Sequence, residues 1–122
     1  MGEYNKVILL GNLTHEPELR YAPTGTPVCE FSLAVHHRQR AEDKSKEEVC
    51  YIDIVAFGPL GERAKANLHK GSQVLIDGRL SQRRWETPEG KRRSKHEVIA
   101  HTVQFIDGAV SFRPGKEEGA ER

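Results

Sequence analysis

Two stretches of the chain alternate apolar and polar residues with the period of a half-buried β-strand. In the first, residues 27–36, the apolar face carries Cys29, Phe31, Leu33 and Val35. In the second, residues 49–57, one face carries Cys50, Ile52, Ile54 and Ala56, and the other carries Val49, Tyr51, Asp53, Val55 and Phe57. Both stretches are predicted to be strands, and Cys29 is predicted to be an unreactive core residue.

One helix is predicted, over residues 59–70. Pro59 suits the first position of a helix, and Gly71 suits the residue just past its end. Apolar residues recur at steps of four on one face of this segment, at Leu60, Ala64 and Leu68. This spacing indicates a short helix that packs one face against a core.

Three further strands complete the predicted fold. The apolar run at residues 7–10 is typical of a strand covered on both faces. Strands are also expected from residue 71 and over residues 97–106, and the latter would place Ile99, His101, Val103 and Phe105 on one face. The order is then three strands, the helix and two strands. This order matches the OB-fold, so the predicted class is all-β with one short helix, a five-stranded Greek-key barrel with long protruding hairpins.

The stretch GSQVLIDGRLSQRRW, residues 71–85, begins as a core strand and ends in basic residues around the only tryptophan. A turn-forming sequence at residues 87–90 precedes a second basic run. We predict a long hairpin that exposes Trp85 and seven cations: Arg79, Arg83, Arg84, Lys91, Arg92, Arg93 and Lys95. Flat rings stack on bases and cations follow phosphates. The alternative is a solvated hairpin whose Trp85 packs on its own stem.

Tyr51 and Phe57 are six residues apart on one face of a predicted strand, which separates them by roughly 20 Å. Two such rings suit stacking platforms for successive parts of a bound strand. They equally suit a second small core or a contact between subunits. The spacing alone leaves these alternatives open.

Composition permits one small domain and does not by itself indicate a partner. The 122 residues are 30% charged with a net charge of +1, so nucleic-acid binding has to rest on the distribution of charge. We expect a domain over residues 1–107 and a flexible tail over residues 108–122, with a polar, mobile hairpin loop at residues 37–48. Neither a membrane span nor a secretory signal is evident, and two cysteines make no disulfide framework, so a cytoplasmic protein is expected.

No pattern of catalytic, metal-ligating or cofactor-binding residues stands out. His36 and His37 lack a second pair of ligands at the spacing of a metal site. No nucleophile with a base partner and no Gly-rich phosphate loop is evident. We therefore expect a protein that is not an enzyme and that uses no metal and no cofactor.

Five short stretches resemble the bacterial single-stranded DNA-binding protein family, in the family's order and close to its spacing. They are NKVILLGNL at residues 5–13, PELRY at 17–21, FG at 57–58, KGSQV at 70–74, and GRL at 78–80 followed by RW at 84–85. The similarity runs over residues 5–106. It implies an OB-fold that binds single-stranded DNA without sequence preference, as a homotetramer, in DNA replication, recombination and repair.

The resemblance also implies roles for individual residues. Stacking aromatics of the family fall at Tyr51, Phe57 and Trp85, and its phosphate-facing cations fall at Arg20, Lys70, Arg83 and Arg84. Charge on the predicted hairpin adds three candidates for phosphate contacts: Arg79, Arg92 and Lys95. The implied location is the cytoplasm, in association with the nucleoid.

This chain departs from the family pattern at several positions. A further aromatic is missing near Gln39, Asp53 stands where a basic residue is frequent, and Pro59 stands where a lysine is frequent. Each departure removes a potential DNA contact. The sequence also ends at Arg122 without the family's acidic tip. Either the sequence is truncated there, or the protein does not recruit replication and repair proteins by that route. An OB-fold adaptor similar to primosomal replication proteins, which mainly bridges protein partners, is the alternative function.

Overall fold

The computed structural model describes residues 2–38 and 47–106. It contains, in chain order, β1 (Val7–Leu13), β2 (Glu18–Tyr21), β3 (Pro27–Arg38), β4 (Glu47–Phe57), α1 (Gly58–Asn67), β5 (Gln73–Glu86) and β6 (Arg92–Ile106). The predicted tail at residues 108–122 and most of the predicted loop at residues 37–48 lie outside the described residues.

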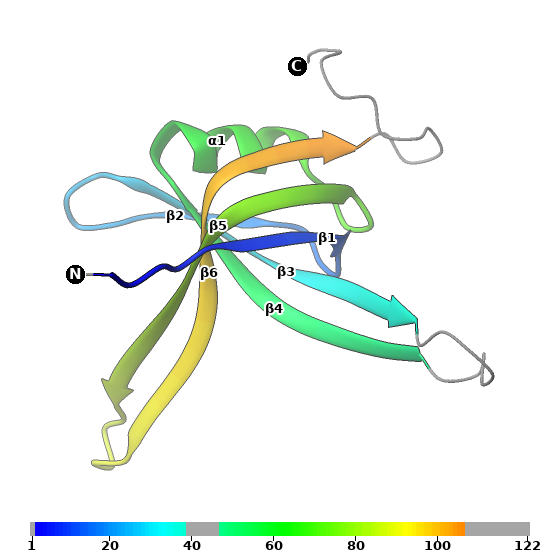
Figure 1. Cartoon of the computed structure of the whole chain (residues 1–122). Coiled ribbons are helices and arrows are strands. Elements are labelled where there is room, and N and C mark those ends of the chain that lie inside the picture. Colours follow the sequence, from blue (N-terminus) through cyan, green and yellow to red (C-terminus); the bar gives the residue numbers. More distant parts are fainter. Residues whose placement is uncertain (1, 39–46, 107–122) are drawn as a thin grey trace.

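The strands form one sheet in the order β1-β5-β6-β4-β3-β2, and an additional pairing of β1 with β3 closes five of them into a barrel (Figure 1). Every neighbouring pair is antiparallel except β4 with β6. The closed five-stranded Greek-key barrel predicted from the element order is therefore confirmed.

The short strand β2 is an element that the sequence pattern did not predict. Its four residues pair only with β3, in a register that sets Arg20 opposite Val28. Four residues are too few for an alternation to be recognised, and a pairing with another part of the chain defines this strand. It extends the sheet beside β3 without joining the barrel.

The helix α1 lies across one end of the barrel (Figure 1) and packs against β3 and β4. It ends at Asn67, three residues before the predicted end, because Leu68 has an extended backbone and is buried. Gly71, with φ of +92°, lies in the turn that follows, where the Ser72 N–H donates to the His69 carbonyl. Burial of Leu68 in the core therefore ends the helix earlier than its sequence signals suggest.

The barrel core is made of the alternating apolar residues of the predicted strands. Its fully buried members include Cys29, Leu33, Ile54, Val74, Ile76 and Val98. Burial raises the pKa of the Cys29 thiol, which keeps this residue in the neutral thiol form. The predicted role of Cys29 as a core residue is confirmed.

A β-bulge in β6 corrects the predicted face of that strand. Asp77 pairs with Thr102 and Gly78 pairs with Ala100, so the residue between these two β6 partners has no partner on β5. The bulge reverses the alternation, and Ile99 faces away from the core while Val103 packs against it. A Cβ atom at position 78 would lie 2.2 Å from the carbonyl oxygen of Ile99. The close approach of β5 and β6 at the bulge therefore requires glycine at this position.

Within the part of the chain that the structure describes, no helix is long and apolar enough to cross a membrane.

Candidate nucleic-acid interface

The three predicted stacking residues lie on one face of the sheet. Side chains alternate along a strand, and directly paired residues of neighbouring strands point to the same side. Asp53 of β4 pairs with Glu97 of β6, which pairs in turn with Ser81 of β5. Steps of two residues from these positions lead to the three rings of Tyr51, Phe57 and Trp85. We call this side the aromatic face; the barrel core lies on the other side of the same strands.

All three rings are accessible in the described structure. Tyr51 is 68% exposed, Phe57 is 46% exposed and Trp85 is 43% exposed. The exposure of Tyr51 does not fit a second small core formed by the described residues, which was one alternative for Tyr51 and Phe57. Phe57 lies beside Val28 and Val55, which are buried on the same face. Large exposed rings on one face of a barrel are available to stack on the bases of a bound strand.

The hairpin of β5 and β6 continues well past the barrel and projects from it (Figure 1). Its strands stay paired up to Glu86 and Arg92, and the Thr87 N–H donates to the Lys91 carbonyl in the connecting turn. Gly90, with φ of +90°, supplies the left-handed backbone of this turn. The predicted long hairpin is therefore confirmed.

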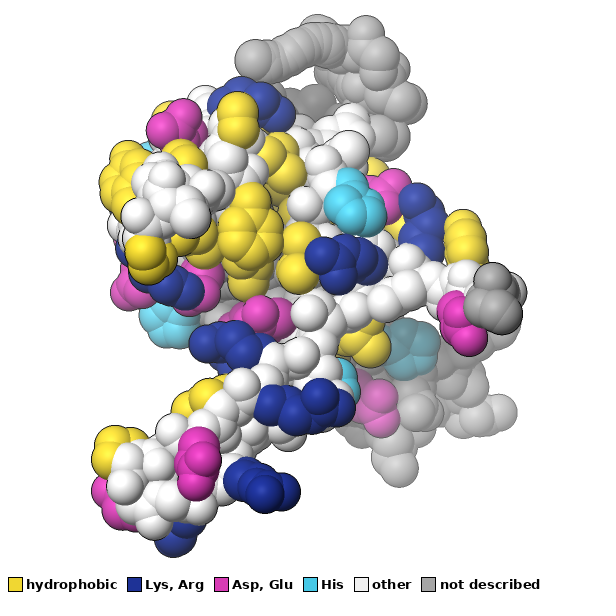
Figure 2. Space-filling model, turned by 90° about the vertical axis from the view of Figure 1, so that its left-hand side faces the viewer, with side chains coloured by type: hydrophobic (Ala, Val, Ile, Leu, Met, Phe, Trp, Pro, Cys, Tyr) yellow, Lys and Arg dark blue, Asp and Glu magenta, His cyan; other side chains and the backbone are white. Residues whose placement is uncertain are grey.

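Figure 2 shows Lys and Arg side chains along the projecting hairpin and hydrophobic side chains gathered on the body beside it. The strand register divides the cations of the hairpin between its two faces. Arg79, Arg83 and Lys95 share the aromatic face, whereas Arg84 and Arg92 lie on the opposite face. The predicted phosphate-binding residues of the hairpin are thus not gathered into one patch.

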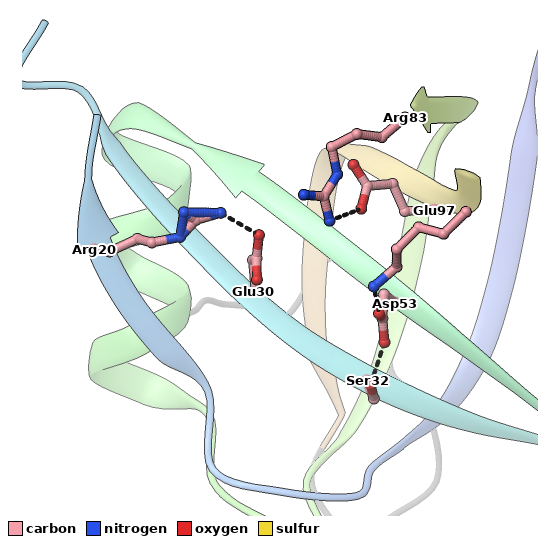
Figure 3. A network of polar contacts seen from close by, with 7 residues as sticks. Arg20, Glu30, Ser32, Asp53, Arg83 and Glu97 are labelled. Atoms are coloured by element: carbon pink, nitrogen blue, oxygen red, sulfur yellow. Dashed lines mark hydrogen bonds and ion pairs between the residues drawn. The ribbon is translucent and has the colours of Figure 1, made fainter. Parts of the chain in front are cut away.

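Trp85 contacts Arg83, which in turn contacts the buried carboxylate of Glu97. Glu97 is only 7% exposed, and its Oε1 lies 3.5 Å from Nη2 of Arg83 (Figure 3). The guanidinium carbon of Arg83 in turn lies 5.3 Å from the centroid of the Trp85 ring. Such cation–π contacts orient a ring, and a planar guanidinium stacks well on an indole. Glu97 and Arg83 therefore fix how Trp85 is presented.

A second carboxylate on the aromatic face is bonded through both of its oxygens. Ser32 donates a hydrogen bond to Oδ1 of Asp53, and the Lys95 ammonium donates to Oδ2 (Figure 3). Partial burial by itself raises the pKa of Asp53, whereas these two hydrogen bonds lower it. The positive charges of Lys95 and Arg83 add to the lowering, so the pKa of this carboxyl lies below its ordinary value of 3.8.

Arg20 of β2 also lies opposite a carboxylate. Its Nη2 is 2.5 Å from Oε2 of Glu30 on the neighbouring strand β3 (Figure 3). The register of β2, β3 and β4 sets Arg20 and Glu30 on the same side of the sheet as Asp53. Arg20 therefore extends the cationic part of the aromatic face on the β2 side.

Three of the seven predicted phosphate-binding cations are thus paired with carboxylates, namely Arg20, Arg83 and Lys95. The other four form no ion pair with another described residue: Lys70, Arg79, Arg84 and Arg92. Among these, Arg84 donates to the Gln82 side chain over 2.9 Å. The partner carboxylates Glu30 and Glu97 were missed by sequence reasoning, because only the strand register brings them to these cations.

Lys70 lies apart from the rest of the candidate site. It follows α1, and its backbone N–H donates to Oε2 of Glu16 over 3.0 Å. This hydrogen bond holds the pKa of the Glu16 carboxyl below its usual range. The next residue, Gly71, bonds the Leu13 carbonyl, which ties the turn to the end of β1. The strand register does not bring Lys70 to the aromatic face.

A closed five-stranded barrel with accessible rings and cations on one side has the architecture of OB-fold domains that bind single-stranded nucleic acids. The comparison with known families agrees with this class. The model of the single-strand binding protein family matches residues 4–106, and the chain belongs to that family.

Curated relatives cover most of the chain. It is 43% identical over 115 residues to the single-stranded DNA-binding protein of Wolinella succinogenes, which covers 93% of this chain and 71% of that one. It is 44% identical over 109 residues to the protein of the same name from Thermotoga maritima, covering 88% of this chain and 77% of that one. With the Helicobacter hepaticus protein the identity is 45% over 109 residues, and the match spans 64% of that relative.

A solved structure shares the fold. The structure titled "Plasmodium falciparum SSB complex with ssDNA" superimposes with a TM-score of 0.78 at 26% sequence identity. The match covers 88% of this chain and 98% of that chain. The predicted OB-fold and the family resemblance are both confirmed.

Proposed function

We propose that this protein binds single-stranded DNA without sequence preference and protects it during replication, recombination and repair. The observation that carries the proposal is the exposure of Tyr51, Phe57 and Trp85 on one face of an OB-fold barrel. It is supported by relatives whose names state single-stranded DNA binding and by a similar structure that contains such DNA.

Stacking supplies affinity that does not depend on sequence, because every base has a flat face. Each stacked base contributes about 1–3 kcal/mol, as measured by alanine substitution. Tyr51 and Phe57 occupy positions six residues apart on β4, roughly 20 Å along the strand. We infer that the two rings stack on different, well-separated bases, and that Trp85 stacks on a third.

Phosphate contacts are proposed for the seven predicted phosphate-binding cations, which differ in how they would reach the DNA. Arg79 is exposed on the aromatic face and forms no ion pair with another described residue, so it is free to meet a phosphate directly. Arg20, Arg83 and Lys95 would have to leave or share their carboxylates. Arg84 and Arg92, on the opposite side of the hairpin, would contact DNA that wraps around it, and Lys70 would contact DNA that extends past α1.

We infer that the protein assembles with copies of itself into a homotetramer. In β1, residues 7–11 pair only with β5, so one edge of this segment carries no partner strand among the described residues. Ile8 is 59% exposed and Leu10 is 49% exposed on the same segment. An open strand edge beside exposed aliphatic side chains favours pairing with a second copy.

The proposed role is that of a binding protein and not of an enzyme, which is consistent with the names of the curated relatives. Residues 1–107 are the proposed DNA-binding domain. A protein with this function would act in the cytoplasm at the nucleoid, where exposed single strands arise. It would also be near other replication and repair proteins.

Alanine substitutions at the three rings test the proposal. Trp85→Ala, Tyr51→Ala and Phe57→Ala should each weaken binding of an oligothymidylate by about 5- to 150-fold, the equivalent of 1–3 kcal/mol. Tyr4→Ala is the matched control, because Tyr4 is an exposed ring outside every strand of the sheet. If the three variants bind as the Tyr4 variant does, the aromatic face is not the DNA site and the adaptor function becomes the better account.

A further inference from the structure

Lys95, a cation of the aromatic face, forms an ion pair with a carboxylate that a second residue also bonds. It stands opposite Arg83 in the hairpin, and its ammonium group reaches back to Asp53 on β4. Ser32 bonds the other oxygen of the same carboxylate. The hydrogen bond from Ser32 therefore orients the Asp53 carboxylate, and its other oxygen is bonded to the Lys95 ammonium group.

The position of Asp53 gives this ion pair a consequence for DNA. Asp53 lies on β4 between the two rings of Tyr51 and Phe57, on the face where a stacked strand would run. A phosphate that approaches Lys95 meets an ammonium group already paired with a carboxylate. It also meets the negative charge of that carboxylate, which repels it.

We propose that Asp53 limits the affinity of the aromatic face for single-stranded DNA by competing with phosphate for Lys95. The inference rests on the proposed function. It adds that a residue of this chain weakens the interaction, so that bound DNA can be released more readily. Asp53 thus lowers the affinity for DNA. Lys95 contributes fully to DNA binding only when the negative charge of Asp53 is removed.

The isosteric change Asp53→Asn separates this role from a purely structural one. The asparagine oxygen can still accept the hydrogen bond from Ser32, whereas the neutral amide no longer holds the ammonium group. One additional phosphate contact raises the magnitude of the slope of log affinity against log salt by about 0.7 for single strands. We expect that increase in Asp53→Asn, with roughly fivefold tighter binding of an oligothymidylate at low salt.

Glu62→Gln is the matched control for net charge. Glu62 is exposed on α1 and forms no ion pair with another described residue. The control removes one negative charge, as Asp53→Asn does, but away from the aromatic face. It should leave the salt slope close to that of the wild-type protein.

A double-mutant cycle with Lys95→Gln completes the experiment, in full-length protein whose folding is checked by thermal melting. Lys95→Gln should weaken binding less than twofold in the wild-type background and roughly fivefold in the Asp53→Asn background. The single variant Lys95→Gln keeps the test valid if Asp53→Asn does not fold, because a large loss there contradicts competition.

The proposal is overturned if Asp53→Asn binds no more tightly than the wild-type protein, or if Glu62→Gln tightens binding equally. Either result leaves the proposed function intact as long as the wild-type protein binds the oligothymidylate. Failure of the wild-type protein to bind would instead overturn the proposed function itself, and the inference with it.

Discussion

The guanidinium group of Arg83 lies over the indole ring of Trp85, with the Arg83 Cζ atom 5.3 Å from the ring centroid. The same group contacts the buried carboxylate of Glu97. One face of the indole is therefore covered within the protein, and the other face is the one on which a base would stack under the proposed function. This contact links the barrel wall to the ring that projects farthest along the hairpin.

Arg83→Lys should loosen the tryptophan while keeping the charge. Lysine lacks the planar group that stacks on an indole, and an exposed cation–π contact is worth about 0.5–1 kcal/mol. We expect lower fluorescence anisotropy of Trp85 in the DNA-free protein. Arg84→Lys is the control, because Arg84 lies on the opposite hairpin face and bonds Gln82. Equal anisotropy in both variants would show that Arg83 does not orient the ring.

Arg79→Ala and Arg92→Ala should differ in their effect on salt dependence. Arg79 is on the aromatic face, whereas Arg92 lies near the hairpin tip on the other face. For an oligothymidylate short enough to occupy one face, Arg79→Ala should lower the magnitude of the salt slope by about 0.7. Arg92→Ala should leave it unchanged until the oligonucleotide is long enough to wrap. Equal salt slopes for Arg79→Ala and the wild-type protein would argue against a phosphate contact of Arg79 on the aromatic face.

Gly78→Ala should destabilise the barrel. The added Cβ would lie 2.2 Å from the Ile99 carbonyl oxygen and 3.0 Å from the Ala100 Cα, and both are backbone atoms of β6. Overpacking of this kind costs typically 1–3 kcal/mol. Denaturant unfolding should show a loss of at least that size, whereas Gly2→Ala, where no atom lies within 4 Å, should unfold as the wild-type protein does. Unchanged stability of Gly78→Ala would contradict the close approach of the β5 and β6 backbones at this position.

Acid should remove the stabilising contribution of Asp53. Its pKa in the folded protein lies below the ordinary value of 3.8, so the folded state binds fewer protons than the unfolded state as the pH falls below about 4. The contribution is complete above that pH and is lost as the pH falls through the folded-state pKa. The difference in unfolding free energy between the wild-type protein and Asp53→Asn should therefore shrink from pH 7 to pH 3. A difference that stays constant or grows would contradict the lowered pKa.

Local patterns sufficed to predict most of the barrel and the side of the sheet on which its rings lie. Alternation along β4 set Tyr51 and Phe57 apart from the core, and basic residues around a turn signal defined the hairpin that carries Trp85. These features depend on neighbouring residues in the chain. They can therefore be predicted without knowledge of the partner strands.

Features that depend on strand register could not be predicted in this way. The bulge at Asp77 and Gly78 reverses the alternation of β6, and nothing in the β6 sequence marks it. The carboxylate partners of Arg83 and Lys95 are 14 and 42 positions away along the chain. Pairings between distant segments bring these charges together, and the sequence pattern of one segment does not contain them.

The most direct measurement is a titration of Trp85 fluorescence with an oligothymidylate at several salt concentrations. Trp85 is the only tryptophan, so the signal reports on one ring of the aromatic face. The account predicts strong quenching on binding and affinity that falls steeply as salt increases. Absence of quenching at low salt would mean that Trp85 does not stack on bases, and would contradict the proposed site.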